Sequence, residues 1–248
     1  MNIDAVIQAR MGSTRLPGKV LLPLGDGTVL EHVLRRSQRC KRLRQVVVAT
    51  TTLPEDEAIV RECERLGVTV VRGPVDDVLA RYAIAAGKLD GDAVVRITSD
   101  CPLVDPVVID DMLAHYAALC ATGTRCDYLA NTLVRTFPRG LDVELVRTEV
   151  LLQANAEASS PPEREHVTPY VHRHPERFAL HGWRASVDAS AHRWTLDTPE
   201  DYQLLSRIFE ALGPTAAESS WLEVLALVNC HPEWSHINQH VEQKAVPG

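Results

Sequence analysis

The alternation of short apolar runs with amphipathic stretches through about the first hundred residues constrains this fold more than any other feature. Strands are predicted at 3–7, 46–49, 68–71 and 93–97, and helices at 29–39, 59–66 and 78–86. Because strands that alternate with helices pair in parallel, this order predicts βαβ units and a parallel sheet. Ligands bind such sheets at the carboxyl ends of the strands, so the loops after Ile7, Ala49, Val71 and Ile97 are expected to form the site.

The pattern changes beyond Leu119, where helices no longer follow every strand. Further strands are predicted at 126–129, 141–144 and 178–187, and further helices at 149–156, 199–212 and 219–228. The chain has no internal repeat and no shift in composition, so we predict a single α/β domain over residues 1–248.

The composition excludes several classes of protein. Apolar residues make up 45% of the chain, enough for a substantial core, and the net charge of −7 is opposite in sign to that of a nucleic-acid-binding surface. No apolar run is long enough to span a membrane, and the first residues lack the pattern of a signal peptide. The six cysteines form no CxxC pair, which is typical of reduced thiols. We therefore expect a cytoplasmic protein that binds neither nucleic acid nor membranes.

The strongest local signal is the loop at residues 8–19, directly after the first predicted strand. It carries three cations, Arg10, Arg15 and Lys19, together with two glycines and two hydroxyl side chains. Glycines let backbone N–H groups approach an anion, and the cations can neutralise phosphate by charge-assisted hydrogen bonds. The loop matches neither GxGxxG nor the P-loop pattern. Its place after a parallel strand favours phosphate binding over a surface loop with solvated cations.

Two aspartates are candidates for binding a divalent cation. Asp100 follows the fourth predicted strand, and Asp197 follows the short run at 193–196 and precedes a helix that begins with proline. Mg²⁺ usually takes one or two carboxylates together with phosphate oxygens and water. In the alternative interpretation, Asp100 is a turn residue and Asp197 belongs to a helix start, with Thr198 as cap and Pro199 at the first position. The two interpretations are compatible.

Several motifs occur together along nearly the whole chain. Beside residues 8–19, they lie at 48–51, 71–73, 76–82, 96–103, 138–144, 165–170 and 195–201. Together they resemble the signature of the CMP-sugar synthetase (cytidylyltransferase) superfamily, which includes the CMP-Kdo and CMP-acylneuraminate synthetases. The resemblance is strongest to the branch that contains spore-coat polysaccharide biosynthesis protein F.

The resemblance implies a fold: a three-layer, Rossmann-like, mostly parallel sheet of the nucleotide-diphospho-sugar transferase (GT-A-like) type, with a small antiparallel dimerisation or acceptor arm. Residues 1–120 would then form the nucleotide-binding half, 121–190 the acceptor and dimerisation region, and 191–248 the metal-site strand and C-terminal helices. We expect a homodimer, since strands that leave the sheet expose edges that a partner subunit can cover.

The resemblance also implies an activity. The chain would be a Mg²⁺-dependent nucleotidyltransferase that transfers CMP from CTP to a sugar acid or related sugar and releases pyrophosphate, in the biosynthesis of a surface or spore-coat polysaccharide. Arg10, Lys19 and Asp100 would be catalytic, and Asp100 and Asp197 would bind the metal. The nucleotide-binding residues would be Gln8, Ala9, Arg10, Gly12, Ser13, Arg15, Lys19, Thr50, Arg72, Gly73 and Ser99.

Other assignments have an equally simple structural explanation. Arg139, Asp142 and Glu144 lie where the family places its acceptor pocket, but alternation along a half-buried strand also explains the two acids. Arg72 and Gly73 could form only a turn after the third strand.

Three histidines invite a zinc hypothesis. His166, His172 and His174 have no fourth ligand at a suitable spacing, which favours histidines on a helix surface.

Three other functions remain open. A transferase acting on a sugar 1-phosphate would share the basic loop, although the usual Gly-Gly before Arg10 is absent. A GT-A-type glycosyltransferase would carry Asp-x-Asp at the fourth strand, where residues 98–100 offer one carboxylate. A non-catalytic nucleotide-binding protein of the same fold would not need to keep both Asp100 and Asp197.

Overall fold

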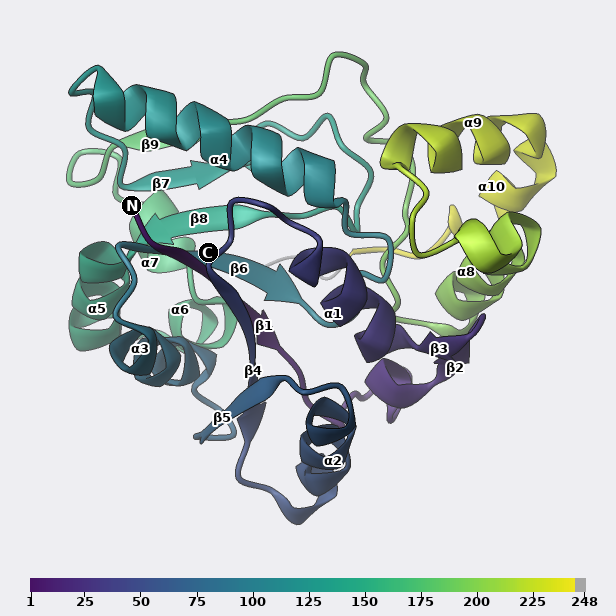
Figure 1. Ribbon diagram of the computed structural model, residues 1–248, viewed down its shortest axis with the longest axis horizontal. Coiled ribbons are helices and arrows are strands. Elements are labelled where there is room, and N and C mark those ends of the chain that lie inside the picture. Colours follow the sequence, from purple (N-terminus) through teal and green to yellow (C-terminus); the bar gives the residue numbers. More distant parts are fainter. Residues whose placement is uncertain (244–248) are drawn as a thin grey trace.

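A seven-stranded sheet with the order β5-β4-β1-β6-β8-β7-β9 forms the centre of the molecule (Figure 1). The computed structural model describes residues 1–243. The strands are β1 (Ile3–Gln8), β4 (Gln45–Thr51), β5 (Thr69–Gly73), β6 (Ala93–Thr98), β7 (Tyr128–Ala130), β8 (Glu144–Arg147) and β9 (Leu180–Gly182). Neighbouring strands are parallel, except that β8 runs antiparallel to β6 and to β7. The predicted mostly parallel α/β sheet is confirmed.

Helices cover both faces of this sheet (Figure 1). The α-helices are α1 (Val29–Gln38), α2 (Glu57–Arg65), α3 (Val78–Leu89), α4 (Pro106–Ala121), α5 (Thr148–Glu157), α6 (Pro161–His166), α7 (Pro169–His172), α8 (Pro199–Leu212), α9 (Trp221–Cys230) and α10 (Ser235–Asn238). Short connections include the 3-10 helices η1 (Lys19–Leu21) and η2 (Pro54–Asp56), and a hairpin of β2 (Pro23–Leu24) and β3 (Gly27–Thr28). Across residues 1–243, every helix is too short or too polar to cross a membrane.

Alternate residues of each strand face opposite layers, and this alternation divides the core in two. Ala5 and Ile7 of β1 pack with residues of α1, α2 and α4, whereas Val6 packs on the other face with residues of α3 and α5. Val94 of β6 shares the face of Val6. By the same alternation, Arg96 leaves β6 on that second face.

A third apolar cluster holds the C-terminal part of the chain against the sheet. Leu196 packs there with Phe209 of α8 and Val224 of α9. Its backbone N–H donates to the carbonyl of Asp100 at 2.8 Å. This contact brings Asp197 next to the loop after β6, although the two segments are far apart in the sequence.

Several predicted elements are corrected by the structure. Helix α4 was not predicted, although Asp105 caps it and Pro106 occupies its first turn, which is a recognisable start signal. The strand predicted at 141–144 begins only at Glu144, because β8 pairs with β6 from the Glu144–Arg96 pair onward. The strand predicted at 178–187 is reduced to β9.

Two larger predictions also change. The antiparallel strand β8 lies inside the main sheet between β6 and β7, not in a separate arm. The predicted metal-site strand at 193–196 makes only one bridge, between Arg193 and Arg139. Residues 244–248 of the last predicted segment lie outside the described residues.

Candidate active site

The loop after β1 is folded back on itself by its own backbone. The carbonyl of Met11 accepts hydrogen bonds from the N–H groups of Ser13 at 2.9 Å and Gly18 at 3.0 Å, and the Met11 N–H donates to Asp56 Oδ1 at 2.6 Å. Gly18 has a φ of 68°, a left-handed conformation that favours glycine. The loop thus ends in η1 with Lys19 directed toward the sheet.

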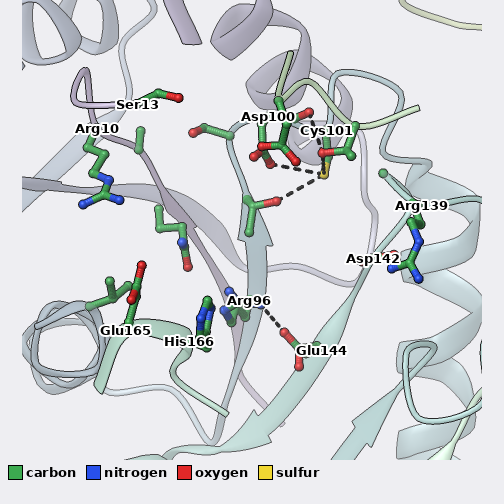
Figure 2. Close-up of a pocket in the computed structure, with 18 of the residues that line it drawn as sticks. Arg10, Ser13, Arg96, Asp100, Cys101, Arg139, Asp142, Glu144, Glu165 and His166 are labelled. Carbon is green, nitrogen blue, oxygen red and sulfur yellow. Dashed lines mark hydrogen bonds and ion pairs between the residues drawn. The ribbon is translucent and has the colours of Figure 1, made fainter. Parts of the chain in front are cut away.

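This loop forms one wall of a cavity of about 600 Å³, a size typical of ligand sites. Figure 2 shows Arg10 and Ser13 on one side of it, Arg139 and Asp142 on the other, and Asp100 between them. Thirteen of the predicted site residues line this cavity: Gln8, Ala9, Arg10, Gly12, Ser13, Arg15, Lys19, Ser99, Asp100, Arg139, Asp142, Glu144 and Asp197.

Lys19 lies at the centre of what we call the lysine cluster, formed by Arg15, Lys19, Asp100, Arg193 and Asp197. Its Nζ donates to Asp100 Oδ2 at 2.6 Å, to Asp197 Oδ1 at 2.8 Å and to the carbonyl of Leu196 at 2.7 Å. Burial alone would lower the pKa of Lys19, but the two carboxylates outweigh it and raise that pKa. Burial would likewise raise the pKa of Asp100, but Lys19 holds it below its usual value.

The second oxygen of Asp197 is fixed by two arginines. Arg15 and Arg193 each donate to Asp197 Oδ2 at 2.9 Å. Arg193 is itself held by buried Asp201, whose Oδ1 accepts from Arg193 Nε at 2.9 Å and from Asn238 Nδ2 at 2.8 Å. Asp201 also accepts from the backbone N–H of Asp197 at 2.9 Å. Asp201 therefore positions the main chain of Asp197 directly and its carboxylate through Arg193.

A second group of charges, the arginine cluster, is formed by Arg96, Arg135, Arg139, Asp142 and Glu144. Arg96 and Glu144 are direct cross-strand partners of β6 and β8, and their side chains form an ion pair (Figure 2). The second acid of the cluster, Asp142, also pairs with an arginine. Arg135 donates to both of its carboxylate oxygens, at 2.6 and 2.9 Å. Arg139 is left without a carboxylate at ion-pair distance within residues 1–243.

Glu144 is committed to contacts within the protein. Its Oε2 accepts from Arg96, and its Oε1 accepts from the hydroxyls of Tyr128 and Thr168, the latter at 2.7 Å. Burial would raise the pKa of Glu144, but Arg96 and these hydroxyls lower it overall. From this pair, Arg96 is the group available to a ligand.

Gly140 joins the two clusters. Its φ is 104°, and a Cβ atom there would lie 2.6 Å from the carbonyl carbon of Trp194. The absence of a side chain lets the neighbouring backbones bond directly, from Trp194 N–H to the Arg139 carbonyl at 2.7 Å. The loop that carries Arg139 therefore lies against the segment that leads to Asp197.

Comparison with known proteins now identifies the family, since a model described as cytidylyltransferase matches residues 5–224. The chain belongs to the cytidylyltransferase family. It is 33% identical over 236 residues, 92% of this chain and 94% of its relative, to spore coat polysaccharide biosynthesis protein SpsF of Bacillus subtilis.

Solved structures agree with this membership. A cytidylyltransferase from Leptospira borgpetersenii has a TM-score of 0.89 at 35% identity, over 99% of this chain and 100% of that one. CMP:2-keto-3-deoxy-manno-octonic acid synthetase complexed with CTP shares the fold, with a TM-score of 0.66 at 16% identity over 85% of this chain and 99% of that one. The predicted family resemblance is confirmed, and membership implies nucleotidyltransferase activity.

Three of the predicted nucleotide-binding residues do not line the cavity of this cytidylyltransferase. Thr50 is fully buried in β4, and its hydroxyl has no hydrogen-bond partner among residues 1–243. Arg72 donates to the carbonyl of Thr51 at 2.9 Å and pairs with Glu57 at 2.7 Å, so it stabilises the turn after β4. At Gly73 a Cβ atom would lie 2.9 Å from Arg81 Cγ. A glycine at this position therefore lets α3 pack closely against the end of β5.

The structure also brings residues to the cavity that the sequence did not indicate as ligand contacts. His166 and His172 lie on α6 and α7 and are partly exposed, as predicted for helix-surface residues, and the surface that they form is part of the cavity lining. Burial lowers the pKa of both imidazoles. Arg96 also lines the cavity and could have been noticed as a charge within an apolar strand. Arg193 does not line the cavity but holds Asp197, and it gives no local signal in the sequence. In residues 1–243, His, Cys, Asp and Glu form no group of three or more suited to a metal.

Proposed function

We propose that this cytidylyltransferase transfers CMP from CTP to a sugar acid or related sugar, with release of pyrophosphate, in the biosynthesis of a surface polysaccharide. The observation that carries the proposal is a single cavity lined by both the basic loop after β1 and the Asp100–Asp197 pair. A triphosphate needs the first feature and its divalent cation needs the second. Similarity to SpsF supports the polysaccharide pathway.

The basic loop is suited to bind the outer phosphates of the nucleotide. Within residues 1–243, Arg10 has no carboxylate at ion-pair distance and is solvent-exposed, so it can bind an anion without first breaking a salt bridge. Lys19 now holds two carboxylates and can turn to phosphate oxygens across the same cavity. Arg15 contacts Asp197 through Nη2 and can donate to phosphate from its other guanidinium N–H groups. Gln8 is the last residue of β1, Ser99 follows the adjacent strand β6, and both line the cavity next to the phosphate loop.

The carboxylate pair fits a Mg²⁺ ion. Asp100 and Asp197 each offer an oxygen to one point, which Lys19 Nζ now occupies, and the Leu196 carbonyl faces the same point. Two carboxylates completed by phosphate oxygens and water are the usual ligand set of this ion. When bound, Mg²⁺ would supply charge stabilisation at the α-phosphoryl group. Arg15 and Arg193 would keep Asp197 oriented.

The acceptor is proposed to occupy the arginine cluster. Arg139 faces the cavity without a carboxylate at ion-pair distance within residues 1–243, and Arg96 is oriented by Glu144. An acceptor with a carboxylate would complete the charge balance of this region, which supports a sugar acid over a neutral sugar. An acceptor hydroxyl oxygen would bond to the α-phosphorus as the bond to pyrophosphate breaks, and the hydroxyl proton would be released to solvent.

A screen of nucleotides against acceptors, with pyrophosphate release as the readout, tests the proposal. CTP with a 3-deoxy sugar acid or an acylneuraminate should give release that depends on Mg²⁺, and neutral sugars should not. The same assay on Asp100→Asn tests one of the two proposed metal ligands. Its matched control is Asp111→Asn, which makes the same change at an exposed position on α4.

The same screen separates the other functions. Release only with a sugar 1-phosphate would identify the alternative transferase. Binding of CTP without release for any acceptor would favour a non-catalytic protein. Transfer from a finished nucleotide sugar would indicate a glycosyltransferase.

A further inference from the structure

Lys19 occupies a complete oxygen cage. An ammonium group has three N–H donors, and those of Lys19 are directed at three different oxygens, at 2.6, 2.7 and 2.8 Å. Two are carboxylate oxygens, from Asp100 and Asp197, and the third is the carbonyl of Leu196. These are the oxygen types that bind a divalent cation in proteins.

The ammonium and a divalent cation cannot use this cage together. A metal bound to Asp100 Oδ2 and Asp197 Oδ1 would lie within a few ångströms of Lys19 Nζ, where like charges repel strongly. Lys19 would also lose all three of its hydrogen bonds in a largely buried position. Lys19 must therefore leave before a metal binds, and it needs other acceptors when it does.

A nucleoside triphosphate would provide those acceptors. Lys19 follows directly on the basic loop and lines the same cavity as Arg10, so phosphate oxygens bound there would come within its reach. The cage would persist after Lys19 left it. Asp197 stays bonded through Oδ2 to Arg15 and Arg193, and Asp100 Oδ1 stays beside the Cys101 thiol at 3.5 Å.

We propose that Lys19 takes the place of the metal in the nucleotide-free protein and gives it up only when a triphosphate binds its ammonium group. Metal and nucleotide then bind with positive coupling, because each favours the state in which Lys19 has left the cage. The inference rests on the proposed function only in taking the cage as a metal site. It adds an order of events, with the nucleotide preparing the site for the metal.

The test measures Mn²⁺ binding to the full chain by electron paramagnetic resonance, without turnover. In the absence of nucleotide, Lys19→Met should bind Mn²⁺ at least about tenfold more tightly than the wild type, since the competing cation is gone. A non-cleavable CTP analogue should tighten Mn²⁺ binding about 5- to 150-fold in the wild type. The same analogue should tighten Mn²⁺ binding clearly less in Lys19→Met, because its phosphate oxygens still contact the metal but no ammonium group has to leave the cage.

Arg15→Met is the matched control, because it removes one positive charge beside Asp197 but leaves all three cage oxygens bonded to Lys19. It should change Mn²⁺ affinity by less than about threefold. Equal tightening in both variants would mean that net charge, not occupation of the cage, controls the metal, and would overturn the inference. Unchanged affinity in Lys19→Met would overturn it as well.

Two further measurements keep the outcome interpretable. Lys19→Gln should behave like Lys19→Met, and a native melting curve for either variant shows that the fold is intact. Adding Asp100→Asn to Lys19→Met should abolish the gained affinity, which assigns the Mn²⁺ to this cage. Absence of pyrophosphate release with every acceptor would reject the proposed function while leaving these binding results, and the inference, in place.

Discussion

In the lysine cluster, carboxylates face the cavity and cations hold them in place; in the arginine cluster, guanidinium groups face it and carboxylates hold them. Asp197 is held by Lys19, Arg15 and Arg193, whereas Arg96 is held by Glu144. The difference suits two ligands of different charge, a metal at the first cluster and an anion at the second. Under the proposed function, each cluster would keep its charged groups paired within the protein until a ligand of opposite charge binds.

The largest expected effect of a substitution belongs to the lysine cluster. Asp100→Asn should lower kcat on the order of 10²- to 10³-fold, as expected when a group that stabilises transition-state charge is lost. The melting temperature should stay near that of the wild type, because Lys19 keeps its bond to Asp197. Steady-state kinetics at saturating metal measures the effect. If the variant kept an activity within threefold of the Asp111→Asn control, the proposed role of Asp100 in catalysis would be rejected.

Glu144→Gln tests the reverse arrangement in the arginine cluster. It should destabilise the fold by roughly 3–5 kcal/mol, because it leaves the buried Arg96 guanidinium without its counter-charge. The double variant Arg96→Met/Glu144→Gln should recover much of this stability but not the affinity for the acceptor. Denaturant unfolding and acceptor KM provide the two measurements. Equal stability of the single and double variants would mean that the pair is not coupled.

The pH dependence gives the same pair a second test. Because the pKa of Glu144 is lowered in the folded protein, its contribution to stability is fully present above about pH 4.3, its ordinary value, and is lost as the pH falls through the folded value. The stability gap between wild type and Glu144→Gln should therefore be constant near neutral pH and shrink in acid. A gap that widened in acid would contradict this sign.

Arg10 and Arg139 allow the two clusters to be compared with one type of substitution. Arg10→Ala should weaken CTP binding by about 1.5–3 kcal/mol, the contribution of a charged hydrogen bond, and leave acceptor KM nearly unchanged. Arg139→Ala should do the opposite. Calorimetry with CTP and kinetics with the acceptor separate the effects. If both variants lost affinity for the same ligand, the division of the cavity would be wrong.

Assembly should respond least to these changes, and the homodimer stays a prediction. The arginine cluster lies on the side of the sheet that ends in the edge strand β9, and exposed Val134 and Val187 lie on two loops joined by the Ala189 N–H to Thr136 carbonyl bond at 2.8 Å. Light scattering at micromolar concentration should give twice the chain mass of 27.4 kDa. A mass of 27.4 kDa would refute the dimer, and Asp100→Asn should leave the result unchanged.

The sequence by itself determined the parallel sheet, the loop after β1 and the position of Asp100. Each depends on residues that are close together in the chain: alternation along a strand, glycines and cations within one loop, and an aspartate directly after β6. The helix start at Asp197 was also correctly predicted, with Thr198 as its cap and Pro199 in the first turn.

Only the tertiary structure decided which charges meet. The Arg96–Glu144 pair depends on the register between β6 and β8, and the bond from Lys19 to Asp197 joins residues that lie 178 positions apart. Local pattern carries no information on such pairs, because strand order and the packing of α8 and α9 bring them together. For the same reason the chain pattern alone placed Arg72 and Gly73 at a strand end but could not show that neither residue lines the cavity.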